Sequence, residues 1–471
     1  MEQDHGSTAS KALRINVDAQ KFGTLAEIGA GQEVARWFFH VGRAAGTIAK
    51  SISAYDMSIS DGLYGPTDIY VSRKRLGSML AHEYDELIER LDAKRGDKTG
   101  FFVFADTAAT RSHSPKREGH GWLGTRFQPQ PRSQPSEIVI HVNLKDQESP
   151  REQEALGILG VNLIYGASYH HHEPSVLITS LMDELSRLRI EVDMVEFSGP
   201  VFAGVDNRLM SLQLVEQNLT DAAMFTADGR VVQPGEVLYQ KPVMMERGSF
   251  RPVTNVTLGM IEQALAQIKN KPDLKSEDVV VLMEMTLSNL MTGRVIDHRD
   301  FLARADMLGA LGKTVLISNY TTFDRVTSYL RQYTQNWIAM VLGLPTLREI
   351  FDEKYYTDLD GGILEGLGRL FRGPVKLYVY PTKETDSADL STAATLEVDP
   401  KLRHLYAYLF ENGFIEPMGA VDARQLHVTP ADVLAKIQSG DPAWEQMVPP
   451  EVVRLIKERT FLGYGESRAS A

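Results

Sequence analysis

The chain has 471 residues, 43% of them hydrophobic and 24% charged, and a net charge of −12. This apolar content argues against wholesale disorder, and the negative charge argues against nucleic acid or an anionic membrane as a general partner. Because the sequence contains no cysteine, disulfides, thiolate nucleophiles and cysteine-ligated zinc or iron–sulfur sites are excluded.

The N-terminal stretch has no apolar core followed by a small-residue cleavage pattern, so it does not resemble a secretory signal. No run approaches the roughly 20 apolar residues that a membrane helix needs. We therefore expect a cytoplasmic protein without a membrane partner.

The length predicts two or three domains. We expect a flexible N-terminus and a frayed C-terminal tail, with three α/β units between them that are joined by charged stretches. The expected boundaries are 1–20 for the N-terminus, 21–150, 151–272 and 273–464 for the units, and 465–471 for the tail.

In the first unit, apolar residues recur at helical spacing from Val34 to Ile48, which predicts a helix. A short strand and an amphipathic helix follow within 67–91. Strands are predicted at 98–109 and 137–144. Between these strands, a polar loop at 106–136 is basic although the protein is acidic.

The middle and last units alternate strands with helices, which predicts parallel or mixed sheets covered by helices and hence an α/β fold. An Asp228-Gly229 pair predicts a hairpin turn. The predicted strands are 190–199, 236–250, 278–286, 313–320 and 375–383. The predicted helices are 153–168, 174–189, 207–219, 257–270, 298–312, 323–334, 336–343, 361–371 and several beyond 400.

Three consecutive histidines, His170 to His172, precede Glu173 and Pro174. Metal ligands on a helix share a face only at spacings of three or four residues, and adjacent residues point in different directions. We therefore favour a polar approach to the following helix over a metal site.

The loop at 106–136 is a candidate anion site, because arginines bind phosphate or carboxylate groups in a bidentate manner and loops often close over ligands. A solvated loop with incidental charge is the alternative. Its candidate residues are Arg111, Lys116, Arg117, His120 and Arg126.

Polar residues also follow two predicted strands of the last unit, and ligands of open α/β sheets bind at the carboxyl ends of strands. Helix capping is the alternative explanation. The candidates are Glu284, Ser288 and Asn289 after one strand, and Ser318, Asn319, Thr321 and Arg325 after the other.

Asp358 and Asp360 precede a glycine-rich helix. Such carboxylates suit a magnesium ion that bridges to a phosphate, whereas a helix cap with a turn is the simpler explanation.

Three segments, 26–65, 189–234 and 317–371, resemble a bacterial family whose members are often labelled nicotinamide- or nicotinate-nucleotide adenylyltransferase, and some TonB-dependent receptor. A receptor of that kind is a barrel with alternating strands of about ten residues, which this chain lacks. The adenylyltransferase label implies a (His/Thr)-x-Gly-His motif after the first strand and a later Ser-x-Thr-x-x-Arg motif. Here the Gly-His pair is Gly119-His120, and the later motif is approximated at 318–325.

We therefore expect an enzyme that acts on a nucleotide or another phosphorylated small molecule, and the resemblance implies nucleotidyl transfer in NAD metabolism with Mg²⁺ as cofactor. In this hypothesis the basic loop and the strand ends share one cavity. The alternative is a non-catalytic protein that assembles with itself or a partner through glycine-rich helices near 29–48 and 361–371.

Overall fold

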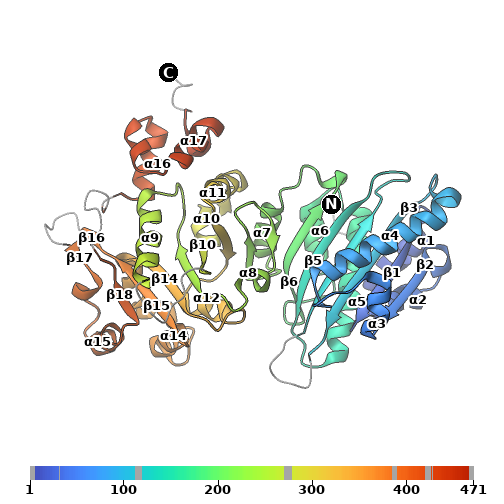
Figure 1. Ribbon diagram of the computed structural model, residues 1–471, viewed down its shortest axis with the longest axis horizontal. Helices are drawn as coiled ribbons and strands as arrows, with labels where there is room; N and C mark the ends of the chain where they lie inside the picture. The colour runs from blue at the N-terminus through green and yellow to red at the C-terminus, as the bar shows by residue number, and fades with distance from the viewer. Residues whose placement is uncertain are drawn as a thin grey trace. The chain divides into compact units, whose positions relative to one another are not determined.

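A computed structural model describes residues 6–30, 32–111, 119–269, 278–383, 390–419, 426 and 428–465. The chain forms two compact units, unit 1 at 1–221 and unit 2 at 222–471. Each unit contains a sheet with helices packed against it, so the expected α/β class is confirmed (Figure 1). Within the described part of the chain, every helix is too short or too polar to cross a bilayer.

Unit 1 is built on a six-stranded sheet with the order β2-β1-β3-β4-β5-β6. The three strands β2, β1 and β3 are parallel, whereas β3 to β6 pair with antiparallel neighbours, so the sheet is mixed. The strands are β1 (Lys21–Gly29), β2 (Ile48–Ala54), β3 (Gly100–Ala109), β4 (Gly119–Phe127), β5 (Ser136–Leu144) and β6 (Ile190–Ser198).

Helices cover both faces of this sheet. Gly160 of α5 lies against Phe104 of β3, whereas Gly124 of β4, which pairs with Ala105, lies against Leu80 of α4. Adjacent strand residues point to opposite faces, so α4 and α5 lie on opposite sides, and α1 and α2 pack against α5. The helices are α1 (Thr8–Val17), α2 (Glu33–His40), α3 (Met57–Tyr64), α4 (Arg73–Arg95), α5 (Ser149–Tyr169), α6 (Pro174–Ser180) and α7 (Asn207–Glu216).

The N-terminus differs from the flexible segment expected at 1–20. Residues 8–17 form α1, and its buried Lys11 donates hydrogen bonds to Asn162 at 2.8 Å and Asp183 at 2.5 Å. A buried ammonium with two polar partners fixes the helix to unit 1. The sequence signal for this helix was hidden because Lys11 occupies a core position.

Two further expectations for unit 1 are corrected. The helix expected from Val34 to Ile48 ends at His40, and β2 begins at Ile48. The expected loop 106–136 contains strand, because β3 continues to Ala109 and β4 spans Gly119–Phe127. Within it, Lys116 and Arg117 lie outside the described residues, as does most of the expected tail at 465–471.

Unit 2 is built on an eight-stranded sheet with the order β18-β15-β14-β9-β10-β13-β7-β8. The six strands from β18 to β13 are parallel, and β7 and β8 add an antiparallel edge at the predicted Asp228-Gly229 turn. The strands are β7 (Ala222–Phe225), β8 (Val231–Val232), β9 (Val243–Arg247), β10 (Val280–Thr286), β13 (Thr314–Ser318), β14 (Ile338–Gly343), β15 (Val375–Tyr380) and β18 (Ile415–Pro417).

The strand order of unit 2 reverses at β9. From β9 the chain proceeds through β10 to β13 on one side, and then returns to place β14, β15 and β18 on the other side. Ligands of open α/β sheets bind outside the carboxyl ends of the strands where the order reverses. The helices are α8 (Pro234–Leu238), α9 (Asn255–Lys269), α10 (Leu287–Leu290), α11 (His298–Ala310), α12 (Phe323–Leu330), α13 (Leu344–Ile350), α14 (Gly362–Leu370), α15 (Arg403–Glu411), α16 (Pro430–Ser439) and α17 (Pro450–Arg459).

Two differences from the sequence expectations concern this sheet. The helix expected at 336–343 is the buried strand β14, since a short apolar run suits either element. The expected unit boundaries at 150/151 and 272/273 also differ from the observed division at 221/222. Strands β5 and β6 pair across the first boundary, and β9 and β10 pair across the second.

Candidate functional site

A pocket of about 220 Å³ lies at the carboxyl ends of β9, β10, β13 and β14 in unit 2, where the strand order reverses. Its walls combine hydroxyl and amide groups with one arginine, one glutamate and several aromatic rings. The lining residues are Arg247, Thr286, Ser288, Asn289, Thr321, Thr322, Phe323, Thr346, Glu349, Ile350, Tyr355 and Tyr356.

Arg247, the last residue of β9, is held in the pocket wall by a buried carboxylate. Its guanidinium donates to both oxygens of Glu284, at 2.8 and 3.0 Å, and the Ser318 hydroxyl donates to the same carboxylate at 2.6 Å. A further N–H reaches the Thr321 carbonyl at 3.1 Å, and the guanidinium lies 4.4 Å from the centre of the Phe323 ring. These contacts fix the cation at the strand end.

The floor of the pocket beside β10 is shaped by a capped turn of helix. Thr286 ends β10 and caps α10, because its hydroxyl accepts the Asn289 N–H at 3.2 Å. The Asn289 side chain in turn accepts from the Thr286 hydroxyl at 2.8 Å. A helix-capping role and a pocket-lining role therefore coexist in Thr286 and Asn289. At α12, the N-cap residue Thr322 forms no capping hydrogen bond through its side chain.

A second arginine, which is buried, ties the loop after β9 to α10 beside the pocket. Arg304 of α11 donates to the carbonyl of Ser249, after β9, at 3.0 Å and to that of Asn289 at 2.9 Å. Asp300, one turn earlier, accepts from the same guanidinium at 2.7 Å. Arg304 thereby links the segments that follow β9 and β10.

The structure brings part of the predicted strand-end set together. Ser288, Asn289 and Thr321 line the pocket, and Glu284 and Ser318 lie beneath it as partners of Arg247. The remaining members lie elsewhere: exposed Asn319 is not among the lining residues, and Arg325 forms an exposed ion pair with Asp358. Asp360 is also exposed.

Sequence reasoning missed Arg247 and the wall formed by Thr346, Tyr355 and Tyr356. Thr346 follows β14, which the sequence misassigned as a helix, so no strand end was expected there. For Arg247, an available signal was its place at the end of an apolar strand run beside a glycine.

The cationic candidates of the expected basic loop belong to unit 1, whereas the strand-end candidates belong to unit 2. Arg126 on β4 pairs with Glu137 at 2.6 Å, and the Arg111 backbone N–H donates to Glu152 at 2.7 Å. His120 on β4 lies 3.3 Å from the His141 ring nitrogen. His141 is in turn 2.6 Å from Asp193, so His120 ends a histidine–histidine–aspartate chain.

The three consecutive histidines lie at the end of α5, with different partners. His171 contacts the Ala167 carbonyl at 3.0 Å, and His172 is exposed and lies 3.2 Å from Glu173. Burial lowers the pKa values of His170 and His171.

Another group of potential metal ligands is formed by His82, Glu83 and Glu86 of α4. Lys50 of β2 already contacts both carboxylates, at 2.6 Å for Glu83. An ammonium therefore supplies the positive charge there.

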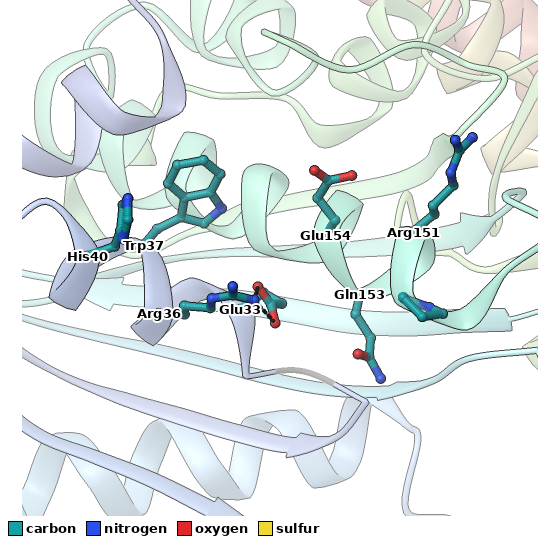
Figure 2. A pocket seen from close by; sticks show the side chains of 8 residues that line it. Glu33, Arg36, Trp37, His40, Arg151, Gln153 and Glu154 are labelled. Carbon is teal, nitrogen blue, oxygen red and sulfur yellow. Dashed lines mark hydrogen bonds and ion pairs between the residues drawn. The ribbon is translucent and has the colours of Figure 1, made fainter.

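Two cavities flank α2 in unit 1 and share Arg36 and His40. One, of about 550 Å³, lies between α2 and the start of α5, and Figure 2 shows Trp37 and His40 on one side of it and Arg151 and Glu154 on the other. The other, of about 560 Å³, is lined by Glu27, Gln32, Ala35, Arg36, Phe39, His40, Ser51 and Ser53; we call it the β2 groove.

Glu27 connects the β2 groove to the interior of the sheet. Its two oxygens accept the N–H groups of Val34 and Ala35, both at 3.0 Å, at the start of α2. Glu27 also pairs with Asp106 on the neighbouring strand β3, and these two residues are 1% and 0% exposed. Burial, opposed by the two N–H groups, raises the pKa of Glu27 to about 7, and burial raises that of Asp106 well above its usual value.

No family model matches the chain, and no curated protein matches it. Among solved structures, the chain is similar to the competence/damage inducible protein from Agrobacterium tumefaciens, with 16% identity over 35% of this chain and 97% of that one, and a TM-score of 0.25. It is also similar to the competence-damaged protein superfamily members from Enterobacter cloacae and Klebsiella pneumoniae. Their identities are 12% and 11%, both over 36% of this chain and over 96% and 99% of theirs, with TM-scores of 0.26 and 0.27. Likeness at this level says nothing about activity.

Proposed function

We propose that unit 2 binds a nucleotide or another phosphorylated small molecule in the pocket beside Arg247. The observation that carries the proposal is the position of this pocket at the reversal of strand order, where α/β sheets bind their ligands. Its lining supplies the two kinds of contact that such a ligand requires.

The polar part of the lining suits a phosphate group. Ser288, Asn289 and Thr321 offer hydroxyl and amide donors, and Arg247 adds positive charge at the end of β9. Glu284 balances that charge, so we expect recognition by hydrogen bonds, with a moderate electrostatic contribution.

The aromatic part of the lining suits a planar base. Phe323, Tyr355 and Tyr356 line the same pocket. Aromatic rings bind bases by stacking, with a contribution of about 1–3 kcal/mol per base. A phosphate-bearing ligand with a base therefore uses more of this pocket than inorganic phosphate does.

Nucleotidyl transfer in NAD metabolism with Mg²⁺ is the finer form of this proposal, and its support is the family resemblance. The Gly-His pair of the early motif, Gly119-His120, lies on β4 of unit 1 instead of after a first strand, and Ser318 and Thr321 of the later motif belong to unit 2. A metal ion at Asp358 would have to displace Arg325 from its ion pair. Binding is therefore the part of the proposal that the site supports best.

Thermal unfolding in the presence of ATP, nicotinamide mononucleotide, NAD or inorganic phosphate tests the proposal. A ligand at 100 times its dissociation constant stabilises by about 2.7 kcal/mol, which corresponds to a rise of roughly 5–10 °C for a unit of this size. No rise with any nucleotide contradicts the proposal.

A blocking variant locates the site. Ser288 is exposed and lines the pocket, so Ser288→Trp fills the space without disturbing the core, and we expect it to abolish the stabilisation. Ser439→Trp, at an exposed serine of α16 outside the lining, is the matched control and retains it. Equal stabilisation of both variants places the ligand elsewhere.

Self-assembly remains the alternative proposal, and it makes a separate prediction. The two helices involved each expose one large apolar side chain, Phe39 on α2 at 54% and Leu364 on α14 at 66%. Single exposed apolar residues are common on monomers, so they favour this alternative only weakly. Light scattering at increasing concentration separates the two proposals, because a constant monomer mass contradicts assembly.

A further inference from the structure

The buried carboxyl pair in unit 1 lies outside the pocket proposed above. Glu27 and Asp106 occupy paired positions on β1 and β3, and neither forms an ion pair within the described residues. Two adjacent carboxylates buried without a cation cannot both ionise at low cost, so such pairs retain a proton near neutral pH.

The hydrogen bonds decide which carboxyl holds that proton. Glu27 receives two backbone N–H groups at the start of α2, where the helix dipole also favours negative charge. Asp106 has a single backbone N–H nearby, that of Ile28, and neither of its oxygens has a hydrogen-bond partner of good geometry among the described residues. The proton therefore resides on Asp106, and Glu27 is the member that titrates.

The β2 groove gives Glu27 access to a ligand. The chain leaves β1 into α2, on the same face as α5, whereas it leaves β2 towards α4 on the opposite face. The two connections therefore diverge beyond the carboxyl ends of β1 and β2. The β2 groove runs between α2 and β2, and Glu27 lines it together with Ser51, Ser53, Arg36 and His40.

We propose that Glu27 is the acid–base group of a second small-molecule site in unit 1, and that Asp106 is a positioning residue that holds a proton beside it. The ligand class is a small polar molecule with an anionic group that faces Arg36 and an N–H or O–H group that faces Glu27. The Glu27 carboxylate takes the proton from that nitrogen or oxygen and returns it to the ligand, so the exchange is balanced without another reactant.

Other charged groups around Glu27 come from α2. They are Glu33, Arg36 and His40, and Arg36 contacts the Glu33 carboxylate at 3.2 Å. The nearby Glu33 carboxylate raises the pKa of Glu27 further, after the larger effect of burial. The pH at which Glu27 titrates therefore depends both on its burial and on the protonation state of Asp106.

Labelling with a water-soluble carbodiimide and glycinamide tests the proposal in the full chain. The carbodiimide activates a protonated carboxyl group, and the amine then forms an amide that mass spectrometry locates by peptide. We expect Glu27 to be labelled with a midpoint near pH 7, between about two and three units above that of an ordinary glutamate. Glu154 on α5, which is 56% exposed, serves as a positive control for the reagent at low pH.

Two outcomes overturn the proposal. Failure to label Glu27 while Glu154 is labelled shows that the Glu27 carboxyl group is inaccessible and merely caps α2. A labelling midpoint of Glu27 below about pH 5 removes its acid–base role.

The variant Asp106→Asn tests whether Asp106 is protonated. Because asparagine replaces a protonated aspartate, we expect the labelling midpoint of Glu27 to stay within about one pH unit of that in the unaltered protein. A larger fall shows that Asp106 is ionised. Circular dichroism verifies that each protein is folded, and none of these results depends on ligand binding in unit 2.

Discussion

Both units place a buried glutamate near the carboxyl end of a parallel strand next to a cavity, but its partners differ. In unit 2, Glu284 receives both arms of Arg247 and the Ser318 hydroxyl. In unit 1, Glu27 receives two backbone N–H groups and has Asp106 as its neighbour. The first carboxylate is neutralised by a cation, whereas the second lies beside another acid.

This difference separates two uses of a buried carboxyl group. A carboxylate with a bidentate arginine is a fixed anchor, and removing its partner leaves an uncompensated charge in the protein. A carboxyl group that is buried beside another acid titrates nearer to neutral pH, which is the property required of an acid–base group. The predictions below test this contrast.

The largest effect is expected for Arg247→Leu. The change leaves Glu284, which is 0% exposed, without its cation, and we expect a loss of about 3–5 kcal/mol in the free energy of unfolding of unit 2. Urea denaturation of the variant measures this loss. The double variant Arg247→Leu with Glu284→Met recovers much of it, and a loss below about 1 kcal/mol in the single variant contradicts the anchoring role.

The second prediction concerns pH. Because the pKa of Glu27 is raised from 4.5 to about 7, the native state holds this proton more tightly than the unfolded chain. The stabilisation is complete below pH 4.5 and is lost as pH rises through about 7, by roughly 3 kcal/mol. Urea denaturation of unit 1 at several pH values measures this slope, which Glu27→Gln reduces and Glu33→Gln retains. The proton on Asp106 supplies the part of the slope that remains in Glu27→Gln. An unchanged slope in Glu27→Gln excludes Glu27 as its source.

A smaller effect is expected for Asp106→Asn at about pH 4, close to the pKa of an aspartate in the unfolded chain. Asparagine has nearly the shape of a protonated aspartate, so we expect a change within about 1 kcal/mol. Asp106→Ala, which removes buried atoms, costs about 1–3 kcal/mol and is the comparison for lost packing. A severe loss in Asp106→Asn, measured by thermal unfolding, indicates a required negative charge.

The smallest effect is expected for Arg325→Ala. Arg325 and Asp358 are 49% and 56% exposed, and exposed pairs contribute about 0–1 kcal/mol. Because Arg325 lies outside the pocket lining, nucleotide-induced stabilisation persists in this variant. Its loss in thermal unfolding assays extends the binding site to α12.

Local patterns explain how much the sequence predicted. The strands at 98–109 and 137–144 and the Asp228-Gly229 turn were predicted because their signals lie within a few neighbouring residues. The strand at 338–343 was missed because six apolar residues carry no decisive period.

The sites depend on long-range pairing, which explains what was missed. Ser288 and Thr321 were predicted from their strands, whereas Arg247 meets Glu284 only because β9 pairs with β10. Likewise, Glu27 and Asp106 are 79 residues apart and become neighbours through the pairing of β1 with β3. A pattern within a short stretch of sequence does not show which residues become neighbours when distant strands pair.

The buried guanidinium of Arg304 has a consequence for the rate and entropy of binding in unit 2. By joining the Ser249 and Asn289 carbonyls, it holds the loop after β9 and α10 in place before any ligand arrives. Binding of a ligand in this pocket therefore requires little free energy for ordering the backbone, and the ligand associates with a surface that is already rigid.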